Sequence, residues 1–267
     1  MISKSLVRLL LTLIIIPFLF TLQAKAGDVQ TNFTISPPPL GYPEFSDELV
    51  ITHQGKALFG TISGDGIDLY GVSAAWIPRV STGYVAADLL VGFHTMMGTI
   101  ETGNGSTDMN FFGFDLAPNA ELLVINLSGF KLIFAAGYSL SNNRSAYMIE
   151  DFTFDTINYY DVTVYINTLM YGPVFTIQGS IMMGTDFMFS PYVVFASISG
   201  TTNTHADPNF EFFNTSYDVP AFRTMTYGFD VLYVPGGLTL SGMLQLLDKS
   251  GDRGEVRITS FGAGIKF

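Results

Sequence analysis

The chain has 267 residues, of which 48% are apolar and only 13% are charged, and its mean hydropathy is +0.36. Typical soluble domains carry about 25% charged residues, so this composition argues against an ordinary soluble secreted domain. The chain has no cysteine, which excludes a disulfide framework and a thiolate metal site. Its formal net charge of −11 argues against a nucleic-acid partner, whose phosphates require a positive surface.

The first 26 residues have the pattern of a secretory signal peptide. Lys4 and Arg8 precede the apolar run "LLLTLIIIPFLFTL", and the small residues Ala24 and Ala26 follow it. We predict cleavage after Ala26, with an uncleaved membrane anchor as the alternative. Cleavage removes three basic residues and no acid, which leaves nine basic against 23 acidic residues and a net charge of −14.

Residues 27–47 contain the proline-rich stretch "SPPPLGYP". Tandem prolines cannot donate the hydrogen bonds of a central strand. We therefore predict an N-terminal extension over 27–47, followed by a single domain over 48–267.

From residue 48 onward the sequence alternates with a period of two. Val85, Leu89 and Phe93 share one face of their segment, while Asp88 and His94 share the other. The uncharged stretch 162–185 is long enough for a membrane helix, but it is rich in β-branched and aromatic residues and is interrupted by glycine and proline. This alternation indicates strands.

The predicted strands are about 10 to 20 residues long, and a tilted membrane strand needs about 9–11. Backbone groups inside a membrane must all be paired, so membrane strands have to close into a barrel. The pattern predicts an all-β fold, a transmembrane antiparallel up-and-down β-barrel. A soluble sandwich or a lipocalin-like barrel is the alternative, although few charges lie on the polar faces.

The C-terminus ends in "SFGAGIKF", an alternating segment that carries Phe261, Ile265 and Phe267 on one face. In this it resembles bacterial outer-membrane β-barrel proteins. The resemblance implies that these three residues form an assembly signal read by the barrel-assembly machinery. It also implies a location in the bacterial outer membrane, with lipid and lipopolysaccharide as partners, both termini in the periplasm, short inner turns and longer outer loops. We expect a monomer.

Counting back from Phe267 predicts ten strands, an even number as the resemblance requires, with eight as the alternative. The first strand is the weakest, because it alternates poorly and carries Lys56 and His53. The long polar segments 142–156 and 201–218 are predicted to be outer loops, and the extension 27–47 to be periplasmic. The predicted strands cover residues 48–62, 66–78, 83–101, 107–126, 129–141, 157–178, 186–200, 219–235, 237–248 and 254–267.

Aromatic residues near the predicted strand ends suggest two membrane girdles. The predicted inner girdle is Trp76, Phe187, Tyr233 and Phe267, and the predicted outer girdle is Tyr159, Tyr160 and Phe222. Strand parity places a mixed set of charged residues toward the lumen: Asp88, His94, Asp115, Glu121, Lys131, Asp230 and Lys266.

Two interpretations of this lumen remain open. The charges can pair across a closed barrel, since buried ions are tolerated only when paired. Alternatively they line a narrow hydrated passage in which glycines such as Gly92, Gly113 and Gly228 leave room. A ten-stranded barrel lies near the size at which side chains fill the interior, so any passage is expected to be narrow.

The sequence does not favour an enzyme. An outer-membrane protease of the omptin type would show an Asp-x-Asp pair and an Asp-x-His pair. The first is absent, and the nearest match to the second is His205-Ala206-Asp207, which has the reverse order and lies in a predicted loop. His94 with Asp88 or Asp115 is the lumen option for a serine–histidine–acid site. No cofactor or metal motif is present, and the loop acids are expected to be solvated.

We therefore predict a non-catalytic outer-membrane barrel with a porin-like, small-solute passage. The alternative is a closed structural or adhesin-like barrel that binds through its outer loops. An outer-membrane hydrolase is a third, less favoured hypothesis.

Overall fold

The computed structural model describes residues 43–64, 66–102, 105–155, 158–207, 214–247 and 256–267. The predicted signal peptide and most of the predicted extension therefore lie outside the described residues. Among the described residues, no helix has both the length and the apolar character needed to cross a membrane.

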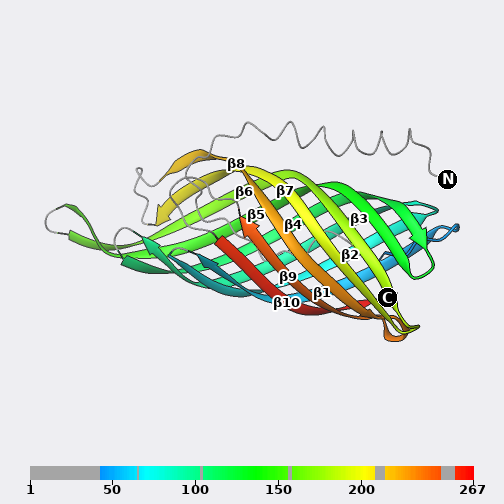
Figure 1. Cartoon of the computed structure of the whole chain (residues 1–267). Coiled ribbons are helices and arrows are strands. Elements are labelled where there is room, and N and C mark those ends of the chain that lie inside the picture. Colours follow the sequence, from blue (N-terminus) through cyan, green and yellow to red (C-terminus); the bar gives the residue numbers. More distant parts are fainter. Residues whose placement is uncertain (1–42, 65, 103–104, 156–157, 208–213, 248–255) are drawn as a thin grey trace.

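Ten antiparallel strands form one closed barrel in which each strand pairs with its neighbours in the sequence and β1 pairs with β10 (Figure 1). The all-β barrel and its ten strands are thus confirmed. The strands are β1 (Val50–Gly64), β2 (Ile67–Thr82), β3 (Val85–Thr102), β4 (Gly105–Leu127), β5 (Phe130–Asp155), β6 (Asn158–Met183), β7 (Phe187–Asp207), β8 (Thr215–Tyr233), β9 (Leu238–Leu247) and β10 (Val256–Lys266).

The first strand is present although it carries Lys56. Its alternation places Gln54, Lys56 and Leu58 inside the barrel, all of them buried. The closing pair runs antiparallel, with Lys56 opposite Gly264. At its inner end, His53 and Phe267 exchange two backbone hydrogen bonds of 3.0 and 2.9 Å, so the C-terminal residue completes the cylinder.

Large apolar side chains cover the outside of the barrel. Phe93, Phe112, Leu240 and Phe261 are each more than half exposed. A monomeric soluble protein rarely exposes so much contiguous apolar surface, because its hydration is unfavourable. The outer face is therefore suited to contact lipid.

The segments 142–156 and 201–218 are mainly strand, so their prediction as loops was wrong. β5 continues to Asp155 and β6 begins at Asn158, while β7 continues to Asp207 and β8 begins at Thr215. Alternation persists there in a weaker form, with Asn143 and Ala206 buried on the inner face. β5 and β6 each have 26 residues, more than twice the length that crosses a membrane, so their hairpin extends far beyond the rest of the barrel (Figure 1).

At one end of the barrel, which we call the short-turn end, residues 83–84, 128–129, 184–186 and 234–237 join consecutive strands. This end carries the aromatic contacts expected of an inner girdle. His53 stacks between Trp76 and Phe267, with ring centroids 5.7 and 5.8 Å away, and Phe187 meets Tyr233 at 5.3 Å.

The predicted outer girdle is not reproduced at Phe222. Phe222 shares the inward parity of Thr224, Thr226 and Asp230 on β8, so it points inward and is buried. The register shift between β7 and β8 comes before Phe222 in the sequence and brings Val219 inward as well. The side chains of Tyr159 and Tyr160 lie outside the described part of the structure.

Candidate functional site: the barrel interior

The inside of the barrel changes character along its length. The buried charged side chains are concentrated in the part near the short turns, where the small apolar cluster of Ala75, Ile77, Leu90 and Ala117 also lies. A larger apolar cluster lies nearer the long hairpins, next to the buried pair Thr168 and Thr202. The structure places all seven predicted lumen residues on inward-facing positions of the strands. Asp88, His94, Asp115, Glu121 and Asp230 are buried, whereas Lys131 and Lys266 are partly exposed at the short-turn end.

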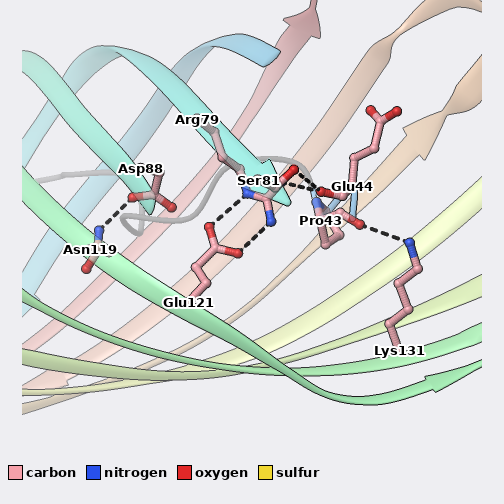
Figure 2. A network of polar contacts seen from close by, with 8 residues as sticks. All are labelled: Pro43, Glu44, Arg79, Ser81, Asp88, Asn119, Glu121 and Lys131. Carbon is pink, nitrogen blue, oxygen red and sulfur yellow. Dashed lines mark hydrogen bonds and ion pairs between the residues drawn. The ribbon is translucent and has the colours of Figure 1, made fainter. Parts of the chain in front are cut away.

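At the short-turn end lies a group of residues that we call the inner mouth: Arg79, Ser81, Glu121, Lys131 and Lys266. The segment Pro43–Ser46 lies against this group. Arg79 of β2 donates from Nε and Nη2 to the two carboxylate oxygens of Glu121 on β4, at 2.9 and 2.8 Å. Both side chains are almost completely buried. Such a bidentate pair is among the stronger charge-assisted contacts in proteins. Figure 2 shows this pair and its neighbours.

Arg79 is not among the residues predicted for the lumen, because the second strand was predicted to end at residue 78, which left Arg79 in the following turn. The inward series Gly71, Ser73, Ala75 and Ile77 in fact continues to Arg79, because β2 runs to Thr82. Extending this alternation by one step would have found the residue.

A second buried pair crosses the barrel closure. Lys56 on β1 donates to Asp230 on β8 at 2.6 Å, and Ser241 on β9 donates to the other oxygen of the same carboxylate at 2.5 Å. Gln54 donates to Thr239 beside them at 3.3 Å. Lys56 weakened the prediction of the first strand, but its inward position and its partner explain why a strand can carry it.

A third group centres on His94. Its Nδ1 lies 2.8 Å from a carboxylate oxygen of Asp115, and its Nε2 lies 2.8 Å from Oδ1 of Asn143. Of the two acids proposed as partners, the structure therefore brings Asp115 to His94. Asp88 instead accepts a hydrogen bond of 2.8 Å from Asn119. With both ring nitrogens engaged by Asp115 and Asn143, this arrangement does not present the imidazole to a nucleophilic hydroxyl.

Glycines inside the barrel make room for other side chains. A Cβ added at Gly113 would lie 2.0 Å from Nε2 of His94, and one at Gly228 would lie 2.2 Å from the hydroxyl of Tyr192. A Cβ at Gly137 would lie 2.0 Å from Oδ1 of Asn119. The room predicted for a hydrated passage at Gly113 and Gly228 is thus occupied by protein atoms.

Beyond the polar groups, towards the long hairpins, lies a cluster that we call the apolar layer. Its buried members come from eight of the ten strands, and the partly buried Tyr147 of β5 and Ile198 of β7 pack against it, so all ten strands contribute. The inward residues singled out from the sequence were charged residues and glycines, so this layer was missed. Its buried members are Leu58, Ile62, Leu69, Met96, Met109, Phe111, Met170, Val219, Phe222, Leu247 and Ile258.

The segment His205-Ala206-Asp207, which partly matches the protease motif, lies at the end of strand β7. His205 and Asp207 are exposed on the outer face, and the His205 ring stacks on Tyr165 with centroids 5.0 Å apart. Parity directs these two side chains away from the lumen, which separates them from the inward acids.

Solved structures with the same architecture are bacterial outer-membrane β-barrels, which confirms the expected class. The chain is similar to the outer membrane protease OmpT from Escherichia coli with a TM-score of 0.56 and 10% identity, over 81% of this chain and 96% of that one. Its fold is that of these proteins, consistent with an outer-membrane location.

Two other solved barrels give TM-scores below 0.5, too low to support further comparison. A major outer membrane protein from Thermus thermophilus gives 0.40 at 11% identity, over 82% of this chain and 100% of that one. Ail, the attachment invasion locus protein of Yersinia pestis, gives 0.35 at 10% identity, over 81% and 97%. No family model matches the chain, and no curated protein matches its sequence.

Proposed function

We propose that the protein is a closed, non-catalytic outer-membrane barrel that acts at the cell surface through its long hairpins. The observation that carries this proposal is the apolar layer, to which all ten strands contribute side chains. An ion passing such a layer would lose its hydration without meeting polar groups, which is strongly unfavourable. The paired charges below the layer then serve to fill and hold the barrel.

The long hairpins supply the surface for this activity. The sequence segments that join the strands at this end, residues 64–68, 100–108, 148–161, 205–218 and 248–255, contain 14 acidic and two basic residues. These segments account for −12 of the −14 formal charges predicted for the mature chain. A concentration of one sign of charge attracts counter-ions and oppositely charged partners.

The partner class that this charge favours is cationic. Basic surfaces or peptides would be attracted directly, and divalent cations could bridge the acids to lipopolysaccharide phosphates at the membrane surface. In this proposal the barrel is a monomer that the barrel-assembly machinery inserts through its C-terminal strand, with Phe261, Ile265 and Phe267 facing outward.

A porin-like passage is the second candidate, favoured by the polar half of the lumen. Planar-bilayer recording separates the two candidates. The purified mature protein should give no stepwise current, and Asp88→Ala and Asp115→Ala should be equally silent. Unitary currents that either substitution changes would contradict the closed barrel and support the passage.

Surface binding is tested by neutralising exposed acids at the long-hairpin end. The triple variant Asp68→Asn, Asp108→Asn and Asp218→Asn should weaken binding of a fluorescent decalysine peptide about 3- to 10-fold at low salt, because exposed charges contribute modestly and additively. The matched control neutralises Asp47, Glu48 and Asp186, which are exposed near the short turns. Equal weakening by both triple variants would contradict binding through the hairpins.

A further inference from the structure

The segment Pro43–Ser46 is held inside the inner mouth through its own backbone. The carbonyl oxygen of Glu44 accepts hydrogen bonds from Nη1 of Arg79 at 2.6 Å and from the hydroxyl of Ser81 at 2.8 Å (Figure 2). The carbonyl of Ser46 accepts from the backbone N–H of Gly83 at 2.6 Å. Three donors of the barrel are thus directed at backbone carbonyls of a short peptide segment.

Side chains add charge and packing to these backbone contacts. The Glu44 carboxylate forms an ion pair with Lys266 of β10, and Lys131 of β5 makes a longer contact of 3.4 Å with the carbonyl of Pro43. The guanidinium of Arg79 lies 4.6 Å above the ring of Phe45, within range of a cation–π interaction. Pro43 itself is buried.

The charges of the inner mouth explain why a carboxylate belongs there. Three cations surround the segment: Arg79 and Lys131 donate to the carbonyls of Glu44 and Pro43, and Lys266 pairs with the Glu44 carboxylate. Glu121 is engaged on both oxygens by Arg79. The Glu44 carboxylate therefore offsets the repulsion among the cations of the inner mouth.

We propose that the inner mouth is a binding site for an extended, carboxylate-bearing peptide, and that the chain's own segment Pro43–Ser46 is its resident ligand. The specificity for this peptide comes from the carboxylate at the Glu44 position, which pairs with Lys266, and from Arg79 and Ser81, which donate hydrogen bonds to the Glu44 carbonyl. The residue before it is proline, which has no N–H, so it presents only an acceptor to Lys131. This site lies at the opposite end of the barrel from the acidic hairpins, and peptide binding there does not depend on what the hairpins bind.

A peptide tethered to its own site has a high effective concentration, so a free competitor binds weakly until the tethered ligand is loosened. Removing the Glu44 carboxylate should loosen the resident segment and expose the mouth to peptide from solution. The apolar layer stays closed in this state, so loosening the segment is not expected to produce ion conduction.

Thiol labelling of the full mature chain tests whether the segment is docked, because the parent protein has no cysteine. Pro43→Cys should react with a soluble maleimide at least tenfold more slowly than Asp47→Cys, which is at an exposed position. Adding Glu44→Gln should accelerate labelling at position 43 about fivefold, as expected for loss of one charge-assisted contact. The matched control Glu48→Gln removes an equal charge from an exposed neighbour and should leave the rate unchanged.

Equal labelling at positions 43 and 47, or equal effects of Glu44→Gln and Glu48→Gln, would overturn docking of the segment. Peptide binding tests the site independently, without any cysteine. A fluorescent peptide spanning residues 43–48 should bind the Glu44→Gln chain at least fivefold more tightly than the parent chain, and adding Lys266→Gln should remove this gain. Equal binding to the parent and Glu44→Gln chains would overturn the proposed peptide site.

Discussion

The two ends of the barrel interior are filled by different kinds of side chain. At the short-turn end, charged groups such as Arg79 and Glu121 pair with one another and a peptide segment fills the inner mouth. Towards the long hairpins, apolar side chains from strands far apart in the sequence, such as Met96 of β3 and Phe222 of β8, belong to one buried cluster. The same alternating strands serve both, so the difference lies only in which residues occupy the inward positions.

This difference has an energetic meaning. A buried ion pair is stable as a pair but leaves an expensive charge behind when one partner is lost. An apolar cluster instead loses stability in proportion to the atoms removed and the cavity left. Single substitutions should therefore be most damaging in the polar part, whereas compensating double substitutions should rescue it.

The largest effect is expected for Lys56→Met. The substitution leaves Asp230 with Ser241 but without its positive partner, which should lower the free energy of unfolding by about 3–5 kcal/mol. Urea unfolding in detergent micelles measures this change. The double variant Lys56→Met and Asp230→Leu should recover most of the loss, and failure to recover would show that packing rather than charge dominates here.

A smaller effect is expected in the apolar layer, where neighbouring methionines provide a matched comparison. Met96 is 1% exposed inside the barrel, whereas Met97 is 45% exposed on the lipid face. Met96→Ala should cost about 3 kcal/mol, because a cavity adds to the lost transfer free energy, and Met97→Ala should cost about 1 kcal/mol. Equal costs in the same urea assay would mean that the apolar layer is loosely packed.

The smallest effect is expected from filling a glycine position. A Cβ at Gly113 meets both His94 and Asn143 within 2.3 Å, whereas a Cβ at Gly55 meets no heavy atom within 4 Å. Gly113→Ala should destabilise the protein by about 1–3 kcal/mol, since the His94 group must shift, and Gly55→Ala should change it by less than about 0.5 kcal/mol. A harmless Gly113→Ala would indicate spare room in the lumen and favour the passage.

Much of the architecture was predictable because side-chain direction in a strand repeats every two residues. Parity alone placed Asp115 and Asp230 inside, and the aromatic C-terminal strand predicted the class of barrel. The same rule was misapplied where a strand end was misjudged or parity was not followed. Arg79 and Asn143 were assigned to a turn and a loop, and Phe222 was assigned to the outer girdle although it has the inward parity of Thr224 and Asp230.

The sequence by itself determined that this chain forms a lipid-facing barrel, because a period of two with one apolar face has few other stable solutions in a membrane. The tertiary structure decided which inward groups meet. Lys56 and Asp230 are 174 positions apart, and Arg79 and Glu121 are 42 apart. The first contact depends on the closure of the cylinder between β1 and β10, and both contacts depend on the register of the strands between the partners.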